Sequence, residues 1–210
     1  LGKGVAAIWH DYDPANEADY HHWHCNEHIP ERVGIPGFLR GRRYAPVSGS
    51  PRFFHFYETA DLSTVTSDAY LERLNDPTPW TQRVVPGFSN NNRTLSEVVA
   101  SFGQGSGAAI ITLRFGPAEG QADALQAWFL EQMPAWVEQE GLVGAHLLRG
   151  DEAASNVQTE EKAMRERADE VAEWVVLVEG LAPSYLETLR QGALSDTTLT
   201  EAGAMQVNAG

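Results

Sequence analysis

Short apolar segments alternate with amphipathic and turn-forming segments along the first half of the chain. Residues 4–12 (GVAAIWHDY) are apolar and end at Asp13-Pro14, which is typical of a strand followed by a turn. A helix is expected from the N-cap candidate Asn16 to about Ile29, because the residue before Pro30 is disfavoured in the α conformation. The other elements expected in this half are strands over 38–45, 53–59 and 93–102, a helix that opens at Thr64 or Ser67 and ends at 75–79, and an irregular stretch over 80–92. This order, β-α-β-β-α-β, is the ferredoxin-like one.

The same order of elements begins again after a Gly-rich stretch. We expect strands over 108–115, 142–149, 173–179 and 202–207, and helices over 121–137 and 185–191. A shift of about 104 residues places Pro30 on Pro134 and Gly37 on Gly141, which favours an internal duplication over a chance likeness. The predicted domains are a first repeat (1–102), a linker (103–107) and a second repeat (108–210) with a polar insertion at about 150–171.

The insertion is charged and helix-favouring, so it is interpreted either as a solvated helix or loop or as a lid over a pocket. One ferredoxin-like sheet carries helices on one face only, and its other face must be covered. The predicted fold class is therefore α+β, with two tandem ferredoxin-like βαββαβ repeats packed sheet to sheet as an intramolecular α+β barrel.

Composition narrows the classes of partner. The chain has 210 residues and a formal net charge of −14, so its surface repels phosphate backbones and anionic lipid. No nucleic-acid partner is predicted, and no membrane partner, because no apolar run approaches the length of a membrane span. The single Cys25 excludes an internal disulfide and suits the cytoplasm. A small-molecule ligand is the expected partner.

Histidines gather in one segment of the first predicted helix. Four of the seven lie between His21 and His28. On a helix His21, His24 and His28 fall within about 60° of one another, with Glu27 nearby. Imidazole beside a carboxylate can exchange protons near neutral pH, so His28 is the first candidate for a general acid or base. A capping or packing role for His28 is the alternative.

A metal site is the competing interpretation of the same histidines. His24 and His28 have the i, i+4 spacing of two ligands on one helix face. A third ligand would come from Glu27, His10 or His55. No second metal motif is present, so no cofactor is predicted and a transition metal at His24 and His28 is kept as an alternative.

Further candidates lie on the predicted strands. His55 and Tyr57 share one strand face, and Arg40, Arg42 and Tyr44 share a face of the second strand. A buried Arg needs an anionic partner, either a substrate carboxylate or enolate or the structural Glu58. The candidates for substrate binding are His10, His55, Tyr57, Arg40, Tyr44 and Trp9, and the aromatic ones have core packing as their alternative.

The stretch from Tyr20 to Tyr44 resembles the dimeric α+β barrel superfamily, and most closely the EthD-like proteins. A helix ends in His28 shortly before Pro30, and the turn Pro36-Gly37 leads into the second strand. The resemblance implies a barrel with an internal pocket, often formed by a homodimer. Because the superfamily includes cofactor-free monooxygenases, lactone isomerases, cyclases and haem enzymes, the resemblance implies no single reaction.

Three functional hypotheses follow. The first is an EthD-like or monooxygenase-like enzyme, a cofactor-independent lyase, isomerase or monooxygenase that does His-based acid–base chemistry on an apolar carbonyl-bearing or phenolic substrate. His28 and His24 would move protons, Glu27 would orient one of them, and Arg42 or Arg40 would stabilise negative charge. The second is a non-catalytic ligand-binding or stress-associated barrel. The third is a His-ligated metalloprotein. A homodimer is a further expectation.

Overall fold

The computed structural model describes residues 1–165 and 167–209. The chain forms two compact units. The first unit consists of residues 2–97 together with 151–171, and the second of residue 1, 98–150 and 172–210. Residues 151–171, the predicted insertion into the second repeat, thus belong with the first unit. No described helix is both long enough and apolar enough to cross a membrane.

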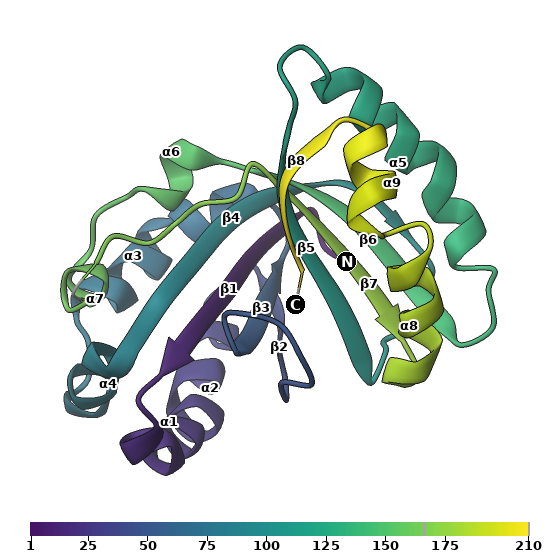
Figure 1. The fold of residues 1–210 in the computed structure, drawn as a ribbon. Helices are drawn as coiled ribbons and strands as arrows, with labels where there is room; N and C mark the ends of the chain where they lie inside the picture. Colours follow the sequence, from purple (N-terminus) through teal and green to yellow (C-terminus); the bar gives the residue numbers. More distant parts are fainter. Residues whose placement is uncertain (166, 210) are drawn as a thin grey trace. The chain divides into compact units, whose positions relative to one another are not determined.

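The first unit is built on an antiparallel sheet. Its strands are β1 (Gly4–Tyr12), β2 (Phe38–Tyr44), β3 (Phe53–Thr59) and β4 (Phe88–Phe102), of which β4 belongs to this unit as far as Glu97. They lie in the order β2-β3-β1-β4 (Figure 1). This is the strand order of a ferredoxin-like fold, as the element order predicts.

Helices follow the first and third strands of this unit. They are α1 (Glu17–Trp23), α2 (Ile29–Val33), α3 (Asp68–Asn75) and α4 (Pro79–Val84), with short 3-10 turns at Pro14–Asn16, Leu62–Thr66 and Val85–Gly87. The prediction of an irregular stretch over 80–92 is wrong in two places. Thr78 caps α4 and accepts a hydrogen bond from the Thr81 amide (3.1 Å), with Pro79 in the first turn, and β4 begins at Phe88 rather than Arg93.

The second unit has the same strand order. Strands β5 (Ala109–Pro117), β6 (Leu142–Gly150), β7 (Trp174–Gly180) and β8 (Ala204–Ala209) lie in the order β6-β7-β5-β8. Helices α5 (Ala122–Trp136), α8 (Pro183–Gln191) and α9 (Asp196–Glu201) supply apolar side chains such as Phe129 and Leu199 to its core. The chain is therefore an α+β protein whose units are each ferredoxin-like.

Two sets of side chains alternate across the sheet of the first unit. Ile8 pairs with His55 and Ala6 with Tyr57, so these four side chains share one face. Helices α1 to α4 cover this face: Trp23 packs in a cluster with Phe53, and Tyr70 in a cluster with Tyr57. The histidines of β1 and β3 are therefore enclosed between the sheet and its own helices.

Residues 151–171 follow the edge of β4 that does not pair with β1. The Arg93 amide donates to the Glu170 carbonyl (3.0 Å), and the Leu95 amide donates to Ser155 Oγ (2.9 Å). Among the described residues of the segment, those of α6 (Glu152–Ser155) and α7 (Glu160–Ala163) are helical. These bonds satisfy backbone groups that an edge strand would otherwise leave unpaired.

Candidate functional site

The helix that carries the histidine cluster widens for one turn. Residues His24–His28 form a π-helical turn between α1 and α2, and the Ile29 amide donates to the carbonyl of His24, five residues back. Pro30 accounts for this geometry, because its ring would crowd the carbonyl of Asn26 in a regular α-helix. π-helical turns of this kind occur frequently at functional sites.

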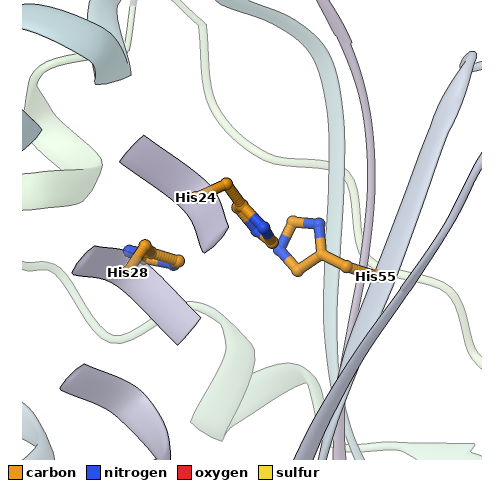
Figure 2. A group of neighbouring side chains, drawn as sticks. All are labelled: His24, His28 and His55. Carbon is orange, nitrogen blue, oxygen red and sulfur yellow. The ribbon is translucent and has the colours of Figure 1, made fainter. Parts of the chain in front are cut away.

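This turn brings three histidines together from two elements. His24 and His28 come from the π-helical turn and His55 from β3, and Figure 2 shows their rings turned toward a common space. One ring nitrogen from each lies within 4.8 Å of those of the other two. All three residues are buried, with exposed fractions of 0%, 7% and 4%.

Ring nitrogens in this cluster lack hydrogen-bond partners. Both nitrogens of His24 and the Nδ1 atoms of His28 and His55 are buried and make no hydrogen bond to the described residues. Burial lowers the pKa of each of the three imidazoles well below its usual value, and the neighbouring histidines and arginines lower it further. The three rings are therefore neutral at physiological pH, the form in which imidazole binds metals.

The distances between the ring nitrogens of His24, His28 and His55 fit a metal ion if the three side chains move slightly closer together. Nitrogens at about 2.1 Å from a tetrahedral ion are roughly 3.4 Å apart, so the longest separation has to shorten by up to roughly 1.4 Å. Three histidines without a carboxylate suit zinc, copper, nickel, cobalt or iron rather than calcium or magnesium. Three protein ligands also leave a coordination position open, as in catalytic sites.

His10 is adjacent to the cluster but fully engaged. Its Nδ1 lies 3.1 Å from the Asp11 carbonyl, which can only accept, so Nδ1 carries the proton. Nε2 consequently accepts from the Tyr20 hydroxyl at 3.0 Å, and Arg43 donates to that hydroxyl at 3.4 Å. Burial lowers the pKa of His10 to about 3. His10 is a supporting residue and not a free ligand.

Glu27 holds neighbouring helices rather than a histidine. Its Oε1 accepts hydrogen bonds from Trp23 Nε1 (3.1 Å) and from the hydroxyls of Thr78 (2.6 Å) and Thr81 (3.3 Å). The carboxylate therefore ties the π-helical turn to the start of α4. The indole of Trp23 in turn packs on the His28 ring, with 4.4 Å between ring centroids.

A cavity of about 30 Å³ adjoins the cluster. His28, His55, Tyr57, Arg93 and Glu161 are among the residues that line it, and Arg93 and His55 share one face of the sheet because both pair with Ile8. All of these residues belong to the first unit. The polar segment 151–171 thus supplies part of the wall, through Glu161 and Arg165.

The remaining predicted candidates lie on the other face of the sheet. Arg42 pairs with Phe56, and its guanidinium lies 4.5 Å from that ring and 3.3 Å from Glu58. Arg40 donates to Glu58 at 2.7 Å, and Arg42 donates to Tyr44 at 3.1 Å. Trp9 also has the parity of this second face. The structure therefore brings His24, His28, His55 and Tyr57 together, and separates them from Arg40, Arg42, Tyr44 and Trp9.

Sequence reasoning missed the charged wall of the cavity. Arg32 is 2% exposed and forms ion pairs with Glu31 (2.8 Å) and with Glu161. Arg165 pairs with Asp169 at 2.6 Å. The only sequence signal was the i, i+4 spacing of acidic and basic residues in the segment 151–171, which is also typical of a solvated helix.

Comparisons with known proteins identify the fold. No protein-family model matches the chain, and no curated protein matches it. Among solved structures, a candidate monooxygenase from Fusobacterium nucleatum has a TM-score of 0.57 at 10% identity, covering 100% of this chain and 91% of its own. A candidate monooxygenase from Lactobacillus acidophilus has a TM-score of 0.59 at 6% identity, covering 99% and 91%. An anthrone oxidase-like protein has a TM-score of 0.57 at 12% identity, covering 98% and 88%. At these identities the likeness shows a ferredoxin-like α+β fold.

Proposed function

We propose that this protein is a small-molecule enzyme whose reaction centre is one transition-metal ion held by His24, His28 and His55. The observation that carries the proposal is a set of three buried, neutral imidazoles whose ring nitrogens lie within 4.8 Å of one another and include atoms with no partner in the described part of the chain. Unpaired buried polar atoms are costly and need an explanation. An ion bound by the three rings would supply their missing partner.

The chain's own residues would hold, orient and enclose the centre. The π-helical turn and β3 present the ligands, and the Trp23 indole restricts rotation of the His28 ring. Such an ion supplies Lewis-acid or redox chemistry when bound. The fold neighbours described as candidate monooxygenases and as anthrone oxidase-like favour an oxidation of a small organic substrate.

Metal-free acid–base catalysis by His28 is the second candidate. The observation that favours it is that His28 lines the cavity, so its imidazole could accept a proton from a molecule bound there. Its weakness is the lowered pKa of this imidazole, which makes it a poor base near neutral pH. The two candidates differ in whether the purified protein needs a metal.

The proposal is tested by metal analysis of matched variants. Wild type, His24→Gln and His22→Gln are expressed with zinc, iron, cobalt, nickel and copper supplements and analysed for bound metal. His22 is an exposed histidine of the same helical segment and serves as the control. We expect about one equivalent of metal in wild type and in the control, and its loss in His24→Gln.

Cobalt(II) titration of the metal-free protein gives an independent readout. Wild type should develop visible absorption bands at one equivalent, and the His55→Gln variant should not. Wild type that binds no metal in either experiment would sink the metal proposal and leave acid–base chemistry at His28 as the working function.

We also propose the finer points of architecture and setting that the resemblance implies. The two ferredoxin-like units would derive from duplication of an EthD-like ancestor and would pack sheet to sheet as an α+β barrel. The protein would act in the cytoplasm, as a homodimer, on a small-molecule substrate. The shared strand order of the two units supports the first of these points.

A further inference from the structure

We infer that the cavity beside the three histidines binds an oxyanion, the carboxylate or an equivalent group of the substrate, through Arg93 and Tyr57. The inference rests on the proposed function only in assigning the anion to a substrate. Binding of the anion itself follows from the groups that line the cavity.

The first argument is the presence of unpartnered donors in the lining of the cavity. The Tyr57 hydroxyl is buried, lines the cavity and has no hydrogen-bond partner among the described residues. Arg165 Nε, from another lining residue, is likewise buried and has no hydrogen-bond partner among the described residues. Arg93 is 9% exposed, and the side-chain bond it makes within the described chain is to the Tyr70 hydroxyl at 3.0 Å. A ligand that fits these groups brings acceptor atoms.

The second argument is charge. Three guanidinium groups line the cavity, from Arg32, Arg93 and Arg165. Arg32 pairs with Glu161 and Glu31, and Arg165 pairs with Asp169 at 2.6 Å and with Glu161 at 3.7 Å. Arg93 makes no ion pair with a carboxylate of the described residues, although it is buried. A buried cation of this kind favours an anion as its partner.

The third argument is size and composition. A volume of about 30 Å³ corresponds to roughly two water-sized groups, which matches the size of a carboxylate. The cavity is too small to enclose a large ligand completely. Tyr57, Arg93 and the two histidines His28 and His55 border the same space. An anion held by Tyr57 and Arg93 would thus lie next to the proposed metal ligands.

The test compares carboxylates with neutral isosteres. Formate, acetate and benzoate are titrated into the full-length protein against formamide, acetamide and benzamide, and binding is followed by calorimetry and by Trp fluorescence, because Trp23 lines the cavity. The titrations are run on metal-free and on zinc-loaded protein. We expect the carboxylates to bind and the amides not to bind, in both forms.

Two variants assign the binding to the named residues. Tyr57→Phe removes a hydroxyl that has no partner among the described residues, so it should fold normally and weaken carboxylate binding roughly tenfold or more. Arg93→Gln should abolish binding. Arg83→Gln, an exposed guanidinium outside the cavity, is the control and should bind as wild type does.

Equal binding of amides and carboxylates, or unchanged binding in Tyr57→Phe, would overturn the inference. Binding that needs zinc and is insensitive to both variants would also overturn it, because the anion would then bind the metal alone, while the proposed function would stand. Carboxylate binding by a protein that takes up no metal would support the anion site and reject the proposed metal centre.

Discussion

The ion pair between Arg32 and Glu161 should be a main anchor of the segment 151–171. The two side chains are 2% and 6% exposed, and they join residues 129 positions apart in the chain. Removal of one partner of a buried pair leaves an uncompensated charge and costs about 3–5 kcal/mol. We therefore expect Glu161→Leu to destabilise the first unit strongly.

The magnitude follows from what remains around Arg32 after the change. Glu31 stays bonded at 2.8 Å but is partly exposed, so it compensates only in part. The loss should fall at the lower end of the range, about 3 kcal/mol, which corresponds to a fall in Tm of roughly 6–12 °C for a chain of this length. Arg32→Leu combined with Glu161→Leu replaces both charges with apolar groups and should lose less than the sum of the singles, by roughly 2 kcal/mol.

Urea unfolding and hydrogen exchange measure the effect. The exchange of peptides covering residues 88–97 should quicken in Glu161→Leu, because residues 151–171 bond to this part of β4. The control is Arg83→Ala, which breaks a pair to Asp19 whose side chains are 60% and 40% exposed. Such exposed pairs contribute less than about 1 kcal/mol. A Glu161→Leu protein that is no less stable than Arg83→Ala would refute the reasoning.

Three further outcomes are expected from the packing of the first unit. The pKa of His10 is lowered to about 3, mainly by burial, so the unfolded chain binds the proton first as the pH falls below 6.5. The metal-free protein should therefore be most stable above about pH 6.5, and this histidine should lower its free energy of unfolding by about 1.4 kcal/mol per pH unit as the pH falls toward 3. Urea unfolding midpoints measured at each pH test this, and a midpoint that does not change over this range would contradict it. Tyr20→Phe leaves Nε2 of His10 buried without its donor and should lower the stability by about 1–3 kcal/mol in thermal unfolding. The control Tyr185→Phe, at a residue that is 38% exposed, should leave the stability unchanged. Equal effects of the two substitutions would be evidence against the Tyr20–His10 hydrogen bond. Gly41→Val should also destabilise, by about 1–3 kcal/mol, because a Cβ at Gly41 would lie 2.9 Å from the Tyr57 ring; an unchanged Tm would show that the ring can move aside.

The chain's local patterns predict its elements well and its functional site in part. Turn residues and alternating apolar positions predict the βαββαβ order of elements along the chain. The i, i+4 spacing of His24 and His28 indicates a possible pair of ligands on one helix face. His55 was one of three candidates for the third ligand, and the structure brings its ring within 4.8 Å of His24 and His28, on the sheet face that Ile8 shares. Arg32 and Glu161 were not predicted, because their pairing depends on a contact between distant segments that no local pattern encodes. The assumption of a regular helix also grouped His21 with the buried pair, although His21 is 43% exposed and bonds to Glu17.

The membership of residues 151–171 in the first unit has a consequence during protein synthesis. Arg32 leaves the ribosome 129 residues before Glu161, and β5 and β6 are made in between. At about 5–20 residues per second this interval lasts roughly 6–26 s. Throughout that time Arg32 of the nascent first unit is without this partner, and β4, from the moment it is made, is without residues 151–171 along its edge. The N-terminal half can therefore reach its final form only after much of the C-terminal half has been translated.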